Sequence, residues 1–189
     1  MNLRRIIIAI GVLVSVSAIV SVYLAIETST SKPNQESSVQ STTSLPSSCQ
    51  APENDTLPDP SCTPGATNPD VKQSTIDITI CVGGYASSIR PPVSYTEPLK
   101  LKLMEAYGYT DSPSNYELDH LIPLEIGGSP LDVRNLWPES HYTTPNSYDK
   151  DGFENYLHDQ VCSGKMDLGT AQNEIATNWI KYWDDAGQP

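Results

Sequence analysis

Isoleucine or valine occupies every even position from 76 to 82, and two of the positions between them are polar. This alternation predicts a half-buried strand over residues 76–82. The glycine pair that follows at positions 83 and 84 predicts its end. Two further short strands are expected, one over residues 119–124, which are largely apolar, and one over residues 133–137.

Three segments place apolar residues three or four positions apart, which is the spacing of a helix with one buried face. They span residues 96–107, residues 144 to about 162, and residues 168–183. Thr96 suits the N-cap of the first helix, with Pro98 in its first turn, and Gly108 suits its end. Thr144-Pro145 predicts the start of the second helix by the same reasoning.

The central elements thus run in the order strand, glycine-containing loop, strand and helix, with helices on both sides. Gly127-Gly128 in the loop allows a sharp bend or positive backbone angles. This arrangement of elements predicts a small α+β domain over residues 68–189.

The N-terminal segment differs from the rest of the chain. Arg4 and Arg5 precede residues 6–26, which carry no charge and are long enough to cross a bilayer as a helix. We expect residues 1–26 to anchor the chain in the cell membrane, with the C-terminal domain outside because the basic pair stays in the cytoplasm. A cleaved secretory signal, which would release a secreted protein, is the alternative.

Residues 27–67 are rich in serine, threonine, proline, glutamine and asparagine, and they contain few large apolar side chains. Such a segment buries too little surface to offset the entropy of ordering. We therefore expect a flexible stalk between the anchor and the domain.

Four cysteines follow the anchor, at positions 49, 62, 81 and 162. An even number of cysteines outside the membrane indicates disulfides, and three pairings are possible. We favour Cys49 with Cys62, which closes a small loop, and Cys81 with Cys162, which joins the start of the domain to its far end. Zinc binding by these thiols is not favoured, because their spacing lacks a CxxC pair.

The formal net charge of the chain is −12, and from residue 65 onward 18 acidic residues face eight basic ones. Such a domain repels polyanions. A role in general nucleic-acid binding is therefore excluded, and any nucleic-acid substrate is expected to bind weakly.

The run Asp119-His120-Leu121-Ile122-Pro123-Leu124, the pair Gly127-Gly128 and the pair Asn135-Leu136 resemble the first two strands of the HNH endonucleases, also called His-Me finger or ββα-metal nucleases. The motif covers about 45 residues. A wider resemblance covers residues 64–183, where the order of shorter motifs is similar to that of small secreted bacterial HNH-like proteins. These motifs are ICVGG, RPP, YGY, RNLWPE, KDGFENYLHDQVCSG and AQNEIATNW.

This resemblance implies an activity and roles for single residues. His120 would be the general base that takes a proton from the attacking water. Asp119 would bind one divalent cation, Mg²⁺, Mn²⁺ or Zn²⁺, and Asn135 would hold the loop and orient the histidine. Arg90 or Arg134 could contact a phosphate, although the motif assigns neither, and Arg90 could equally be an ion-pair partner.

The second metal ligand, which the family places on the following helix, is not evident. Asp151, Asn155 and His158 can lie along one stripe of that helix and complete a metal pocket, or they can form a solvated face. A further difficulty is that adjacent residues of a regular strand point to opposite faces. Asp119 and His120 can share a site only where the strand is irregular or ends.

Two functions remain open from the sequence. The first is an extracytoplasmic, metal-dependent phosphodiesterase of the HNH type that hydrolyses DNA or RNA. The second is a catalytically inactive HNH-like module with a binding or envelope-structural role, since a fold alone does not imply an activity.

Overall fold

The computed structural model describes residues 44–52 and 54–189. The predicted membrane anchor and the first part of the predicted stalk lie outside these residues. Within the described part of the chain, no helix has the length and apolar character required to span a bilayer. The described residues combine helices with a single small sheet, which agrees with the predicted α+β class.

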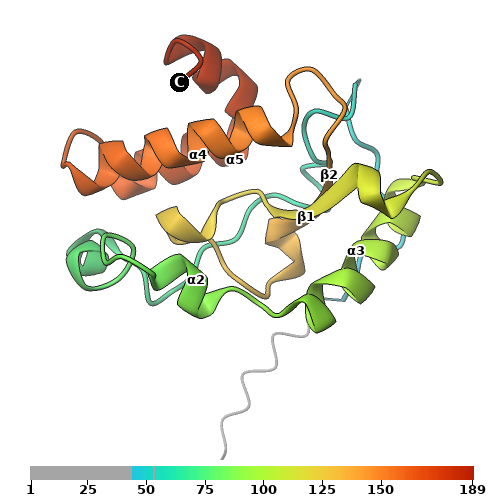
Figure 1. Cartoon of the computed structure of the whole chain (residues 1–189), viewed down its shortest axis with the longest axis horizontal. Coiled ribbons are helices and arrows are strands. Elements are labelled where there is room, and N and C mark those ends of the chain that lie inside the picture. The colour runs from blue at the N-terminus through green and yellow to red at the C-terminus, as the bar shows by residue number, and fades with distance from the viewer. Residues whose placement is uncertain (1–43, 53) are drawn as a thin grey trace, which may run out of the picture. The chain divides into compact units, whose positions relative to one another are not determined.

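Two antiparallel strands form the centre of the fold (Figure 1). They are β1 (Tyr116–His120) and β2 (Leu136–Ser140). Glu117 lies opposite Glu139 in their register, and Asp119 lies opposite Trp137. Opposite residues of a pair share one face of the sheet, so these four side chains project from the same face.

Both strands are displaced by about three residues from their predicted positions. Residues 121–124 do not continue β1, because the chain turns after His120 and a 3-10 turn, η3 (Leu124–Ile126), follows Pro123. A second 3-10 turn, η4 (Val133–Asn135), delays the start of β2 to Leu136. The strands were predicted from runs of apolar side chains, whereas the whole of β1 has the largely polar sequence YELDH.

The strand predicted over residues 76–82 is wrong. The structure has a 3-10 helix, η1 (Gln73–Ile78), followed by turns, and Ile78 is 76% exposed. The Thr75 hydroxyl donates to the Asp70 carbonyl at 3.0 Å and accepts from the Lys72 N–H at 2.9 Å. Such local side-chain bonds compete with strand pairing, and no described strand lies beside this segment to stabilise it.

The predicted first helix exists but begins earlier than expected. After the short α2 (Tyr85–Ile89), α3 runs from Val93 to Tyr107, with Pro92 at its N-cap and Pro98 inside it. Gly108 ends α3 with a φ of 73°, as predicted. α3 packs against both strands, and its Leu99 and Leu103 meet Leu136 of β2.

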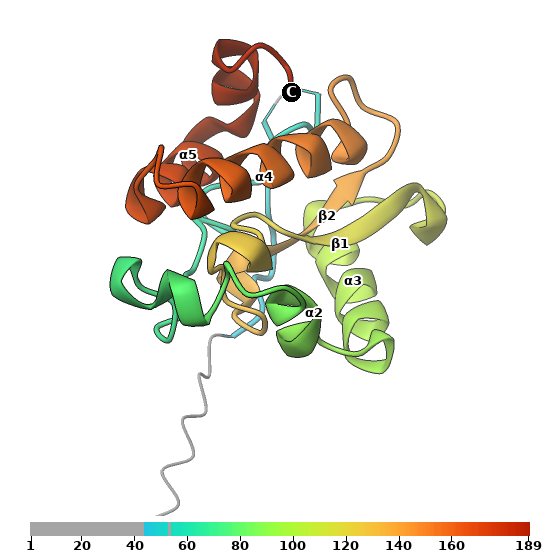
Figure 2. The ribbon, with the colours of Figure 1, turned by 60° about the vertical axis from the view of Figure 1, so that its left-hand side comes forward.

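The two C-terminal helices cover the other side of the fold, away from α3 (Figure 2). α4 (Ser147–Cys162) and α5 (Leu168–Asp185) pack against each other, and Asn178 breaks the regular geometry of α5. Their main buried side chains are Phe153, Leu157, Val161, Ala171, Ile175 and Trp179. Asn146 caps α4 through its side chain, so the predicted cap at Thr144 is wrong by two residues.

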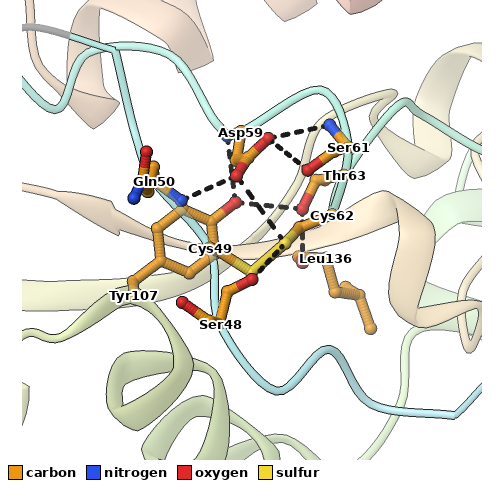
Figure 3. The surroundings of a disulfide bond; sticks show 9 residues. All are labelled: Ser48, Cys49, Gln50, Asp59, Ser61, Cys62, Thr63, Tyr107 and Leu136. Carbon is orange, nitrogen blue, oxygen red and sulfur yellow. Dashed lines mark hydrogen bonds between the residues drawn. A yellow bond between two sulfur atoms is a disulfide. The ribbon is translucent and has the colours of Figure 1, made fainter.

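Both predicted disulfides are present, Cys49–Cys62 and Cys81–Cys162. The first lies beside the Asp59 carboxylate, which accepts backbone N–H groups of Gln50 and Ser61 (Figure 3). The Cys49 N–H donates to the Ala106 carbonyl of α3 at 2.8 Å. This part of the predicted stalk is therefore packed on the domain. Two disulfides are consistent with an extracytoplasmic location.

Candidate functional site

Asp119 of β1 and Lys150 of α4 form a buried ion pair. Lys150 Nζ lies 2.8 Å from Asp119 Oδ2, it also contacts the Glu154 carboxylate, and its side chain is 1% exposed. Burial by itself lowers the pKa of Lys150, but the charges of Asp119, Glu154 and Glu139 together raise it well above its usual value. Lys150 is therefore a charged ammonium fixed beneath the hairpin.

Two more carboxylates share the Asp119 face of the hairpin. Burial, assisted by the nearby Asp119 charge, raises the pKa of Glu117 to about 7 and raises that of Glu139 well above its ordinary range. One carboxylate oxygen from each of these three residues lies within 4.8 Å of the other two. Trp137 donates its indole N–H to Asp119 Oδ2 at 3.0 Å. Carboxylate oxygens in this arrangement could hold a hard metal ion.

A small cleft of about 70 Å³ lies beside β1. Its charged or titratable lining residues are Arg90, Glu117, Asp119, His120, Asp151 and Glu154. A larger pocket of about 390 Å³ lies elsewhere, around residues 80–87 and His158, and is mainly apolar. We place the candidate site in the smaller cleft, because acid, base and cationic groups converge there.

His120 ends β1, so it lines the same cleft as its neighbour Asp119. The residue is buried and only 5% exposed. Its Nε2 lies 3.2 Å from the carbonyl oxygen of Pro130. Because a carbonyl only accepts hydrogen bonds, Nε2 carries the proton and the neutral ring keeps its lone pair on Nδ1. No described residue bonds to Nδ1.

The protonation state of His120 follows from its surroundings. Burial lowers the pKa of the imidazole, and the Asp119 carboxylate offsets only part of that shift. The ring is therefore neutral at pH 7, with a free basic nitrogen.

Asn135 holds the loop that carries Pro130. Its Nδ2 donates to the carbonyls of Ile122 at 2.9 Å and Ser129 at 3.1 Å, and its Oδ1 accepts the Ile122 N–H at 2.9 Å. Asn135 thus fixes the residue next to Pro130 and, through it, the carbonyl that orients His120. Asn135 itself does not line the cleft.

Each glycine of the pair in this loop is required for a different structural reason. Gly127 has a φ of 80°, a region that favours glycine. A Cβ on Gly128 would lie 1.7 Å from the Ile122 carbonyl oxygen, so only glycine fits there. The bend and the positive backbone angle expected from the sequence are both present.

The two candidate arginines occupy different places. Arg90 is exposed and lines the cleft, and among the described residues it forms no ion pair. Its expected ion-pair role is therefore not observed. Arg134 lies outside the cleft, is 53% exposed and pairs with Asp132 at 2.6 Å. Only Arg90 is placed to contact a ligand in the cleft.

The helix ligands predicted from the sequence do not come together. Asp151 lines the cleft, but Asn155 is exposed and donates to the Asp151 carbonyl of its own helix. His158 bonds the Ile80 carbonyl at 3.0 Å and lines the separate larger pocket. The predicted stripe does not form a metal pocket, because helix positions 155 and 158 point away from the hairpin, whereas positions 150 and 154 face it.

Sequence reasoning missed three residues of the site, namely Glu117, Glu139 and Lys150. A signal for Lys150 existed, because it precedes the buried Phe153 and Leu157 by three and seven residues and so lies on their face of the helix. A signal for Glu117 existed as well, since it stands two residues before Asp119 on one strand face.

A second group of possible ligands, Cys49, Asp59 and Cys62, is also close together. Its two sulfurs form a disulfide and are not available as thiolates, so the carboxylate group remains the candidate. Comparison with protein-family models, with curated proteins and with solved structures finds no match for this chain.

Proposed function

We propose that this protein is an extracytoplasmic, metal-dependent phosphodiesterase of the HNH type, which hydrolyses DNA or RNA. The observation that carries the proposal is the neutral, tautomer-fixed His120 beside Asp119 in a charged cleft. The ββα order of β1, β2 and α4 and the motif around Asp119-His120 support it.

His120 is the general base in this proposal. Its Nδ1 takes a proton from water, the water oxygen forms a bond to phosphorus, and the ester oxygen leaves with a proton from solvent. The Pro130 carbonyl holds the ring in the tautomer that this step requires, and it stabilises the imidazolium that forms. Asn135 acts as a positioning residue because it fixes the adjoining Ser129 carbonyl.

Asp119 is the expected metal ligand. Its Oδ2 is held by Lys150 and Trp137, while no described residue bonds to Oδ1. A divalent cation bound at Oδ1 would neutralise phosphate charge and stabilise the leaving oxygen. Arg90, exposed at the cleft without a carboxylate partner, is positioned to bind a phosphate oxygen.

The charge of the chain limits the substrate. Four carboxylates line the cleft, and the formal net charge is −12, so duplex binding through many phosphate contacts is unfavourable. Short fragments or single strands that present one phosphodiester to the cleft are the expected substrates.

The test is cleavage of single-stranded and plasmid substrates at low salt with Mg²⁺, Mn²⁺, Ca²⁺ or Zn²⁺. His120→Ala should reduce the rate at least about 100-fold, which is the usual contribution of a general base. His141→Ala is the matched control, because His141 bonds the Ser147 hydroxyl at 2.7 Å and does not line the cleft. Equal rates for wild type and His120→Ala would contradict the proposal.

An inactive module is the second candidate, and two observations favour it. The Lys150 ammonium already neutralises Asp119, and His120 is largely enclosed. In that case Asp119, His120 and Lys150 stabilise the fold, and wild-type protein leaves every substrate intact with all four cations.

A further inference from the structure

Three carboxylates converge on one face of the β1–β2 hairpin. Glu117 and Glu139 are directly opposite each other, and Asp119 follows Glu117 by two residues on the same face. Because they belong to paired strands, backbone hydrogen bonds fix their relative positions. One oxygen from each lies within 4.8 Å of the others.

Glu139 gives an independent indication that this group has a ligand. It is 2% exposed, and its Oε2 is buried without a hydrogen-bond partner among the described residues. A buried acceptor without a partner is unfavourable, and native proteins seldom leave one unless an ion, a ligand or a water satisfies it. The unpartnered oxygen belongs to the same set of converging carboxylates.

The local charges are also unbalanced. Lys150 forms ion pairs with Asp119 and Glu154, but among the described residues neither Glu117 nor Glu139 has an ion-pair partner. These two carboxylates therefore face each other with no basic side chain of the described residues paired to either one. When both are ionised they repel each other in a region of low dielectric, and a bound cation would offset that repulsion.

We propose that Glu117, Asp119 and Glu139 bind one divalent cation of the size of Ca²⁺. Asp119 contributes Oδ1, while Lys150 and Trp137 hold its Oδ2 in place. Oxygens on opposite sides of Ca²⁺ are about 5 Å apart, because Ca–O bonds are about 2.3–2.6 Å long. Three oxygens that lie within 4.8 Å of one another can therefore share one such ion.

The metal ligands proposed here lie on the hairpin, whereas the sequence predicted further ligands on the helix. The ligands come from β1 and β2, and α4 contributes Lys150 as a fixed counter-ion rather than a ligand. Glu117 and Asp119 line the cleft, so a cation can enter from it, and Glu139 completes the set from the interior. The inference rests on the proposed function for the role of the cation in catalysis, but not for its binding.

The test measures cation binding to the full chain without substrate. Calorimetric titration with Ca²⁺ should show one saturable site per chain. Tb³⁺, used as a luminescent replacement for Ca²⁺, should emit on tryptophan excitation, because the Trp137 indole lies against Asp119. Glu117→Gln and Glu139→Gln should each weaken Ca²⁺ binding at least about tenfold, since each removes one ligand charge.

Glu105→Gln is the matched control, because Glu105 is an exposed acid on α3 and should keep wild-type affinity. Circular dichroism checks the fold of each variant, and if Glu139→Gln does not fold, Glu117→Gln decides. Absence of saturable binding in the wild type, or unchanged affinity in both variants, overturns the inference.

The same measurements separate this inference from the proposed phosphodiesterase. Binding that depends on Glu117 and Glu139, without any cleavage, supports the cation site and contradicts only the enzyme. Cleavage that depends on His120, with unchanged Ca²⁺ affinity in the glutamate variants, contradicts only the cation site.

Discussion

Lys150 Nζ lies 2.8 Å from Asp119 Oδ2, and this contact joins the first turn of α4 to the end of β1. The lysine also reaches the His120 carbonyl at 3.3 Å and the Glu154 carboxylate. A single buried ammonium thus organises both the backbone and the side chains of the cleft.

Replacing Lys150 with methionine should lower the free energy of unfolding by about 3–5 kcal/mol at pH 7. The change keeps the volume but leaves Asp119 and Glu154 buried without their cation. Urea unfolding at pH 7 measures it.

The matched control for this change is Lys181→Met. Lys181 pairs with Asp185 on the surface, where both side chains are more than half exposed, and such a pair contributes less than about 1 kcal/mol. Similar losses for the Lys150 and Lys181 variants would contradict the importance of the buried pair.

The stability of the protein should decrease as the pH rises from 5 to 8 in the absence of divalent cations. The folded pKa of Glu117, about 7, and that of Glu139 lie above the usual value of 4.5. The folded state therefore binds more protons than the unfolded state in this window. These two groups therefore contribute their full stabilisation below about pH 4.5, the pKa in the unfolded state. This stabilisation is lost as the pH rises through the pKa of the folded state.

We expect a loss of about 2 kcal/mol from pH 5 to pH 8, since one pKa unit corresponds to about 1.4 kcal/mol. Unfolding by urea at several pH values measures the profile. Glu117→Gln should flatten it, whereas Glu105→Gln should not. A wild-type profile that rises over this range would show that these acids are ionised in the folded state.

The rate of the proposed reaction should fall at low pH with a midpoint below 6.5. His120 must be neutral to accept a proton, and burial lowers its pKa. With a saturating divalent cation, kcat/KM measured from pH 4.5 to 8 should therefore stay high at pH 6.5. A midpoint above pH 7 would identify a different base.

Gly128→Ala should destabilise the fold by at least about 3 kcal/mol, because the added methyl group overlaps the Ile122 carbonyl. Gly169→Ala is the control, since nothing lies within 4 Å of its Cβ position and alanine favours the helical conformation by up to about 1 kcal/mol. Thermal unfolding of both variants gives the comparison. Equal midpoints would show that the loop adapts to the methyl group.

The long helices could be predicted from the sequence, because α4 and α5 bury apolar residues at regular helical spacing. Gly108 and Gly127-Gly128 could be predicted for a similar reason, since each occupies a conformation or contact that few other residues allow. The strands could not be placed correctly, because one of their buried faces carries Glu139 and Asp119 beside the single apolar side chain of Trp137. A pattern of hydrophobic residues contains no signal for such a face.

The site could be predicted only in part. Asp119, His120 and Arg90 share the cleft, which agrees with the motif and with the phosphate contact considered for Arg90. Lys150 was missed because a lysine in a helix is normally assigned to solvent. Burial of this lysine depends on Asp119, which precedes it by 31 residues, as well as on Glu154 of the same helix, so only the folded structure makes both partners evident.

The Cys81–Cys162 bond encloses β1, β2 and most of α4 in one covalent loop. A protease that cuts the backbone once within this loop therefore does not release a fragment. Such a nicked chain migrates as one band on a denaturing gel until a thiol reductant separates it into two, and the residues that line the cleft stay tethered to each other after the cut.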